Sequence, residues 1–339
     1  MKKIVTPTDR DFIETVDDQL FCVVGYLHPP DGYTAYLKYV PSNTGKWEKN
    51  GTRYQRVIPY YQVSQVENTY EYLKKYYSKY LFKCPVRNIE TSWVPKQKVK
   101  KYFKPIERMQ EIEKHGPKDR LEEKLSKLVS ILCEQTGLIE SLGVTGSILT
   151  KTHNPKFSDM DITVYGLDEA YKIKKSIEAL KKEAEKIKPI SRAEMENWVK
   201  NRVDKFNLNR FDLLKIAEKR WNYGYYLDTY FSVHPIRKEG EIKEKYGDNT
   251  YHRRGEIMGT ATITDASESI YLPAIYKIKK SQHQVTEIVS FEGLFGGIFQ
   301  KGDEIKFKGV LEEVKGRKPH FRIIVGGANS PDSYIKWVD

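Results

Sequence analysis

The sequence predicts an α+β protein with a β-rich N-terminal domain carrying one helix (1–115), a mixed middle domain (116–240) and a β-rich C-terminal domain (241–339). Three observations support this fold class. The 339 residues exceed what one ordinary core holds. Helical periodicity is concentrated in the middle third, and short strand-like runs between Gly, Pro and Asp turns fill both ends. The middle domain is therefore expected to be a mixed sheet flanked by helices.

In the N-terminal region, "QLFCVVGYL" and "YTAYLKYV" read as a hairpin around the turn "HPPDG". Strict alternation would place Leu37 and Tyr39 on one face of the second strand and Lys38 on the other. "VENTYEYLKKYYSKYLF" is typical of a helix. The prolines that follow predict an extended connector: Pro85, Pro95 and Pro105.

The middle region begins with a helix in "PKDRLEEKLSKLVSILCEQTG", whose leucines recur at helical spacing and whose Gly137 is a suitable stop. A second helix is expected in "LDEAYKIKKSIEALKKEAEKI", since Asp168 and Glu169 suit the dipole of its first turn. "NWVKNRVDKFNLNRFDLLKIAEKRWNYG" also reads as helical. "YYLDTYFSVHPI" is aromatic and β-branched, which predicts a strand.

The C-terminal region contains five strand-like runs between turn residues: "GEIMGTATIT", "SIYLPAIYKI", "TEIVSFEGLF", "DEIKFKGVLEEV" and "HFRIIVGG". Short strands at this spacing predict a small barrel or curled sheet, of which an OB-like barrel is one form.

Composition limits the class of protein. With 39% hydrophobic and 31% charged residues, the chain reads as soluble and globular. It lacks an apolar run near the roughly 20 residues that cross a bilayer, and the start turns acidic early, so we expect a cytoplasmic protein without a membrane partner. Three distant cysteines (Cys22, Cys84, Cys133) indicate neither a zinc site nor a disulfide framework.

Charge favours a polyanionic partner. The net charge is +12 and 24 tyrosines offer faces on which unpaired bases could stack, so RNA is the favoured nucleic acid. Solvated surface charge would look the same. The candidate nucleic-acid-binding residues are Lys46, Arg53, Arg56, Arg253 and Arg254.

The stretch "GVTGSILTKTHNPKFSDMDITVYG" (143–166) contains the candidate site. Residues two apart on a strand share a face, so Asp159 and Asp161 point together while Met160 and Ile162 point into the core. At about 5 Å and an effective dielectric near 20, the two carboxylates repel by ~3 kcal/mol. Protonation or a nearby cation could offset this repulsion, and a hard divalent ion does so best.

The turn before this strand suits an anion. Gly146 and Ser147 follow a short apolar run and could open a helix whose N–H groups receive a phosphate. Taken singly, a Gly-Ser pair or an Asp-x-Asp is more often a turn with a solvated cap. In this order, however, they form a specific pattern.

"GS" at 146–147 and "SDMD" at 158–161 resemble the signature of nucleotidyltransferases of the DNA polymerase β superfamily. Stretches such as "GYLHPPDGYTAYLKYVPSNTGKW" look like an archaeal group of predicted nucleotidyltransferases. The resemblance implies a nucleoside triphosphate substrate, two Mg²⁺ (or Mn²⁺) ions, and Asp159 and Asp161 as metal ligands. It also implies phosphate binding by Gly146 and Ser147, with Ser158 and Lys151 as further nucleotide-binding candidates.

Polymerase-type members of that superfamily carry a third carboxylate on a neighbouring strand. The candidate here is Asp228, as both a catalytic residue and a metal ligand, because an acid inside an aromatic strand needs a partner. The alternatives are a sheet-edge position or pairing with Arg237 or Arg220. His234, which precedes a proline, is expected to be a packing residue.

Two functions follow from these observations. The first is a metal-dependent nucleotidyltransferase that moves NMP from an NTP to an acceptor, with an RNA end as the favoured acceptor. The alternative is a catalytically idle nucleotidyltransferase fold that binds RNA or the ribosome. The position of Asp228 relative to the aspartate pair distinguishes the two; the sequence names no protein partner.

Overall fold

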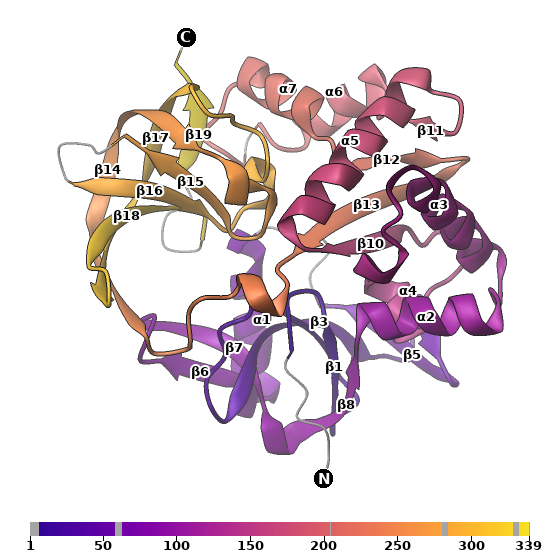
Figure 1. The fold of residues 1–339 in the computed structure, drawn as a ribbon. Coiled ribbons are helices and arrows are strands. Elements are labelled where there is room, and N and C mark those ends of the chain that lie inside the picture. Colours follow the sequence, from indigo (N-terminus) through magenta and orange to yellow (C-terminus); the bar gives the residue numbers. More distant parts are fainter. Residues whose placement is uncertain (1–6, 58–62, 204, 280–283, 328–331, 339) are drawn as a thin grey trace.

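The computed structural model describes residues 7–57, 63–203, 205–279, 284–327 and 332–338, and these residues form three sheets with flanking helices (Figure 1). The predicted α+β class is confirmed. The N-terminal sheet lies below the other two parts in this view, with the helix-covered middle sheet on one side above it and the C-terminal strands on the other.

The N-terminal sheet has the order β4-β5-β3-β2-β1-β8, with β7 pairing β3 and β6 pairing β7. β2 and β3 form the expected antiparallel hairpin. The bounds are β1 Phe12–Thr15, β2 Leu20–Val23, β3 Gly32–Pro41, β4 Trp47–Lys49, β5 Thr52–Arg56, α1 Val63–Tyr76, β6 Leu81–Cys84, β7 Ile89–Pro95 and β8 Val99–Phe103.

Two expectations for this sheet were wrong. The proline-punctuated stretch is not a connector, because Pro85 and Pro95 lie at strand ends and Pro105 opens a helix, where a missing N–H costs little. The alternation of β3 is also broken. Leu20 pairs with Tyr39 and Phe21 with Leu37, so Lys38 is the extra residue of a β-bulge, and Leu37 and Tyr39 belong to different hydrophobic clusters.

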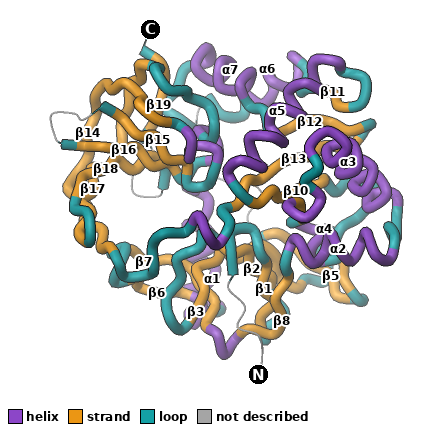
Figure 2. The backbone as a smooth tube through the Cα atoms, viewed as in Figure 1, coloured by secondary structure: helices purple, strands orange, loops and turns teal. Residues whose placement is uncertain are grey.

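The middle sheet has the order β11-β12-β13-β10-β9, in which β10 and β13 are parallel. Figure 2 shows α2 to α5 gathered beside it. Its elements are α2 Pro105–His115, α3 Arg120–Thr136, β9 Leu142–Val144, α4 Gly146–Thr150, β10 Met160–Tyr165, α5 Leu167–Glu183, β11 Ile187–Lys188, β12 Tyr223–Tyr226 and β13 Thr229–Ile236.

Both helices predicted beside this sheet are present. α3 ends at Gly137, which adopts the left-handed conformation that favours glycine, and α5 carries Asp168 and Glu169 in its first turn. Leucine and isoleucine side chains of α3, β10 and α5 form one core. Met109 and Ile112 of α2 join it, although α2 precedes residue 116, where we placed the start of this domain.

Two segments of the middle region are interrupted. The third helical run is two helices, α6 Arg192–Lys200 and α7 Arg210–Lys219, each opened by a capping box, at Ser191 and Asn209. The expected single strand is a hairpin of β12 and β13, because Leu227 takes a left-handed φ of 54° and turns the chain. A Leu-Asp turn lacks the glycine that would have revealed it.

The C-terminal strands form the expected small barrel. The order is β14-β15-β16-β18-β17-β19, and additional pairing of β14 with β17 closes a ring of five strands. Helices α6 and α7 contribute Val199, Leu213 and Ile216 to its core. The bounds are β14 Asn249–Asp265, β15 Ala274–Ile278, β16 Val285–Ser290, β17 Glu304–Gly316, β18 His320–Val325 and β19 Tyr334–Trp337.

Candidate active site

The two aspartates lie where β10 begins. Asp159 precedes the strand and Asp161 is its second residue, while Met160 and Ile162 are fully buried in the core. Both aspartates line the same large cavity. The period of the strand therefore brings two carboxylates to one wall of the cavity.

The pKa values of Asp159 and Asp161 are shifted in opposite directions. The charge of Asp161, and then burial, raise the pKa of Asp159 to about 6. Burial also raises the pKa of Asp161, but hydrogen bonding and charge from His234, together with Lys38 and Ser232, more than offset it and hold that pKa below its usual range. At neutral pH, Asp161 is thus firmly ionised and Asp159 is the residue that bears the repulsion.

Gly146 allows the Asp161 carboxylate to lie against the turn before α4. Gly146 has a φ of 68°, and a Cβ there would lie 2.3 Å from Asp161 Oδ2. The backbone N–H of Thr145 donates to the carbonyl of Asp161 at 2.8 Å. Any side chain at 146 would displace the carboxylate, so glycine is required both for backbone conformation and for space.

The neighbouring strand β13 supplies Ser232 and His234. Parallel pairing places Ser232 beside Asp161, and Ser232 Oγ donates to Asp161 Oδ1 at 2.5 Å. His234 Nε2 lies 2.8 Å from Ser232 Oγ and 3.6 Å from Asp161 Oδ1. Burial, followed by the nearby charge of Arg10, lowers the pKa of His234 to about 4, so the ring is neutral at pH 7 and donates to the serine.

His234 is therefore more than a packing residue, contrary to our expectation. The sequence did contain a signal: Ser232 and His234 are two apart in a β-branched run and so share a face. Which partner that face meets was not readable, because the register of β13 on β10 joins residues 71 positions apart.

Asp228 does not join the pair. It lies in the turn between β12 and β13, its side chain is 69% exposed, and it is not among the residues that line the cavity. Its carboxylate accepts hydrogen bonds from Lys124 and from Thr229 Oγ1. The turn that splits the expected strand is the physical reason, since it carries Asp228 to the far end of the hairpin. Neither Arg220 nor Arg237 is its partner in the described contacts.

The expected phosphate-binding residues are only partly together. Gly146 lines the cavity, and Ser147 is buried behind it in α4. Ser158 Oγ instead accepts from the N–H of Asn154 at 3.0 Å, which closes the loop before β10. Lys151 pairs with Glu111 at 2.5 Å and does not line the cavity.

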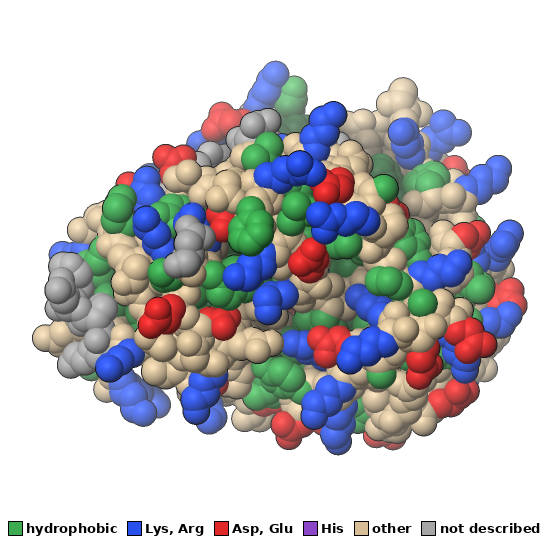
Figure 3. All heavy atoms as spheres, turned by 90° about the horizontal axis from the view of Figure 1, so that it is seen from above, with side chains coloured by type: hydrophobic (Ala, Val, Ile, Leu, Met, Phe, Trp, Pro, Cys, Tyr) green, Lys and Arg blue, Asp and Glu red, His purple; other side chains and the backbone are tan. Residues whose placement is uncertain are grey.

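The expected nucleic-acid contacts also divide. Arg56 and Arg253 line the cavity, as do Arg10 and Lys38. The remaining candidates lie outside it: Arg53 lies 3.9 Å from Glu48, Arg254 Nε donates to Glu313 at 2.9 Å, and Lys46 is exposed. Figure 3 shows Lys and Arg side chains spread over one face among acidic ones, in keeping with the net charge of +12.

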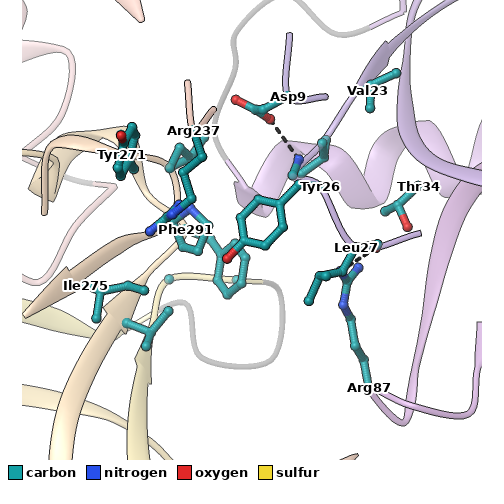
Figure 4. A pocket seen from close by; sticks show the side chains of 18 of the residues that line it. Asp9, Val23, Tyr26, Leu27, Thr34, Arg87, Arg237, Tyr271, Ile275 and Phe291 are labelled. Atoms are coloured by element: carbon teal, nitrogen blue, oxygen red, sulfur yellow. Dashed lines mark hydrogen bonds between the residues drawn. The ribbon is translucent and has the colours of Figure 1, made fainter. Parts of the chain in front are cut away.

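The cavity has a volume of about 1680 Å³ and is lined by all three parts of the chain. Pockets for small-molecule ligands usually measure roughly 300–1,000 Å³, so this cavity is larger than a pocket for one nucleotide needs to be. Figure 4 shows the part of the cavity wall where the side chains of Tyr26, Arg237 and Tyr271 lie close together. The Arg237 guanidinium lies 5.2 Å from the ring centre of Tyr26 and 4.3 Å from that of Tyr271, distances at which a cation and an aromatic ring attract each other.

A second acidic cluster lies away from the cavity. Ligand atoms of Asp119, Glu122 and His153 lie within 4.8 Å of one another. Asp119 caps α3 by accepting from two backbone N–H groups, and Glu122 pairs with the buried Arg108. His153 Nε2 donates to Asp119 Oδ2 at 2.7 Å. These oxygens already have partners, so the cluster is explained as a helix cap and ion pair.

Comparison with known proteins shows the family to which the chain belongs. Residues 125–220 match the nucleotidyltransferase domain. Over 336 residues the chain is 34% identical to an uncharacterized protein of the archaeon Methanocaldococcus jannaschii, an alignment covering 96% of this chain and 98% of that protein. No solved structure matches. The chain belongs to the nucleotidyltransferase family of the DNA polymerase β superfamily, as the Gly-Ser and Asp-x-Asp residues suggested. Within the described residues, no helix is long and apolar enough to span a membrane.

Proposed function

We propose that the protein is a metal-dependent nucleotidyltransferase that transfers NMP from an NTP to the terminal hydroxyl of an RNA. The observation that carries the proposal is the Asp159–Asp161 pair at one wall of a cavity larger than one nucleotide needs, with the Asp161 carboxylate lying against Gly146. Nucleotidyl transfer is the reaction of the matched domain; the metal, the triphosphate and the RNA end are our inferences.

The residues fit divalent ions. The charge of Asp161 raises the pKa of Asp159, so the two carboxylates repel each other, and carboxylate oxygens are the donors that Mg²⁺ and Mn²⁺ prefer. When bound, two such ions would neutralise the triphosphate, lower the pKa of the attacking hydroxyl and stabilise the leaving pyrophosphate. Asp159 and Asp161 would hold them.

The chain's own residues would position the reactants. Ser232 occupies one oxygen of Asp161 and so fixes the direction of the other, which lies at Gly146. By the resemblance, the turn of Gly146 and Ser147 receives the β and γ phosphates. The acceptor oxygen would form a bond to the α-phosphorus, the bond from that phosphorus to pyrophosphate would break, and the hydroxyl proton would leave to solvent.

The C-terminal barrel supports a single-stranded acceptor. We propose that it is OB-like, a fold that binds oligonucleotides on its second and third strands and on the loops after its first and fourth strands. Here β15 and β16 line the cavity through Ile275, Lys277 and Val289. The loops after β14 and β17 line it as well, through Tyr271 and Lys318.

Incubation with each labelled NTP, Mg²⁺ and total RNA tests the proposal. We expect transfer to RNA that Asp159→Asn and Asp161→Asn each abolish and that EDTA prevents. Lys151→Met serves as the matched control, since this cation lies in the same loop but outside the cavity. Failure to label any RNA with any NTP, or labelling that survives both aspartate changes, would overturn the proposal.

A catalytically idle, RNA-binding fold is the second candidate. The observation that favours it is the position of Asp228, together with the sequence of β13, which carries no acidic residue between Thr229 and Ile236. This candidate predicts RNA affinity that falls steeply with salt and is indifferent to Asp159→Asn. The RNA affinity of the parent protein and of Asp159→Asn, measured across salt concentrations beside the transfer assay, distinguishes the RNA-binding fold from the enzyme.

A further inference from the structure

The N-terminal sheet lies outside the matched residues 125–220, yet it reaches the aspartates. Lys38 of β3 and Arg56 of β5 line the cavity together with Asp159 and Asp161. Trp47 of β4, over whose ring the Arg56 guanidinium lies, packs edge-on against Phe157, two residues before Asp159. Two strands remote in sequence thus bring their cations to the same corner.

We propose that Lys38 and Arg56 form a polyphosphate-binding site that holds the triphosphate of the incoming nucleotide. This inference rests on the proposed function, because it assigns the substrate's phosphates to residues of the same site. It makes the N-terminal sheet part of the active site rather than an accessory RNA-binding domain.

The bulge in β3 aims Lys38 at the cavity. Lys38 is the residue skipped in the pairing of β3 with β2, and a bulge redirects side chains locally. Lys38 is only 7% exposed, and its ammonium lies 5.3 Å from the ring centre of Phe12. A lysine this buried is stable when it faces negative charge, which the aspartates supply in the ligand-free protein.

Arg56 is held in place by aromatic rings. Its guanidinium carbon lies 4.7 Å from the ring centre of Trp47 and 5.9 Å from that of Tyr39. Stacking of this kind fixes the plane of the guanidinium, and an arginine so oriented presents its N–H donors in the fork geometry that phosphate oxygens match. Arg53, three residues earlier on the same strand, is 58% exposed and lies outside the cavity.

The N-terminal sheet contacts the turn at Gly146 and Ser147 and the loop before Asp159. Thr145 Oγ1 donates to the carbonyl of Arg10 at 2.7 Å. Leu149 of α4 packs in the cluster of the N-terminal sheet, and the Trp47 ring lies edge-on to Phe157, with centres 5.9 Å apart. Lys38 and Arg56 are therefore fixed relative to Gly146 and the aspartates, as a preorganised site requires.

Charge balance gives these cations a role in the loaded site. Two carboxylates and a triphosphate carry more negative charge than two divalent ions neutralise. Ions held by the aspartates would offset the negative charge of the carboxylates, and the phosphates of the nucleotide would then supply the remaining negative charge near Lys38 and Arg56. A charged hydrogen bond from each to phosphate compensates that excess.

Direct nucleotide binding tests the site without requiring turnover. Kd for a fluorescent, non-hydrolysable NTP is measured with Mg²⁺ for the full chain and for Lys38→Met and Arg56→Gln, which keep the side chains' apolar stems. We expect each change to weaken NTP binding by about tenfold or more, because charge-assisted bonds are lost. Binding of the matching nucleoside, which lacks phosphates, should be unchanged.

Arg53→Gln is the matched control and should leave Kd for the NTP as in the parent protein. Thermal melting identifies variants that fail to fold, and Lys38→Arg should then restore most of the affinity. Unchanged NTP affinity in folded Lys38→Met and Arg56→Gln, or equal weakening by Arg53→Gln, would overturn the inference even if RNA is labelled. NTP binding that depends on both cations but yields no transfer would overturn the proposed reaction alone.

Discussion

Ser232 lies beside Asp161 on the adjacent parallel strand, and its hydroxyl donates a hydrogen bond to Asp161 Oδ1 at 2.5 Å. The resemblance to polymerase-type enzymes called for a carboxylate on a neighbouring strand. The residue on β13 that meets Asp161 carries a hydroxyl instead, backed by His234. The site is thus a carboxylate pair whose second member is oriented from β13.

Ser232→Ala should weaken metal binding more than it weakens the fold. Losing an outer partner of a metal ligand costs about 10–100-fold in metal affinity or activity, because the ligand is no longer oriented. The Mg²⁺ concentration for half-maximal transfer, or the Mg²⁺ dependence of NTP binding, measures the effect. Ser232→Thr, which keeps the hydroxyl, is the control. An equal loss of Mg²⁺ affinity in both variants would mean that the packing of residue 232 matters and its hydrogen bond does not.

Asp159→Asn should stabilise the metal-free protein at neutral pH. The folded-state pKa of about 6 exceeds the ordinary 3.8, so the ionised carboxylate costs the fold stability above pH 6, by about 2–3 kcal/mol. The folded state binds this proton more tightly, so the contribution of Asp159 to the free energy of unfolding rises as pH falls from 7 toward 4. Urea unfolding in EDTA at pH 7.5 and pH 4.5 should show the gain at the higher pH and its loss at the lower. A gain of equal size at both would contradict the charge argument.

Gly146→Ala should remove activity and destabilise the protein by about 1–3 kcal/mol, the usual range for forcing a side chain into a left-handed turn. The added Cβ meets Asp161 Oδ2, so the carboxylate must move. Transfer assays and urea unfolding measure the two effects. Gly137→Ala also strains a left-handed glycine, but no atom of the described residues lies within 4 Å of the added Cβ. This change should lower stability while leaving transfer intact.

Asp228→Asn should leave nucleotidyl transfer unchanged. Its carboxylate is exposed in the β12–β13 turn and bonds Lys124, so no reacting group depends on it. The rate of transfer and its Mg²⁺ dependence are the measurements, compared with Asp161→Asn in the same assay. A loss comparable to that of Asp161→Asn would mean that the hairpin rearranges when substrates bind.

Sequence alone determined the features that depend on local patterns. Helices α3 and α5 follow from leucine spacing, capping and glycine stops, and the small C-terminal barrel from short strands between turn residues. The shared direction of Asp159 and Asp161 follows from the two-residue period of a strand. Each of these is written within a few neighbouring residues, where backbone geometry is decided by side-chain size and by local hydrogen bonds.

Only the tertiary structure decided which distant groups meet. The register that sets Ser232 beside Asp161, the turn at Leu227 that removes Asp228, and the bulge that aims Lys38 into the cavity all depend on how strands far apart in sequence pair and pack. A shift of one residue in such pairing would reverse every side chain, and burial of the whole core selects among the registers. The aspartates could therefore be found by reading the chain, but their partners could not.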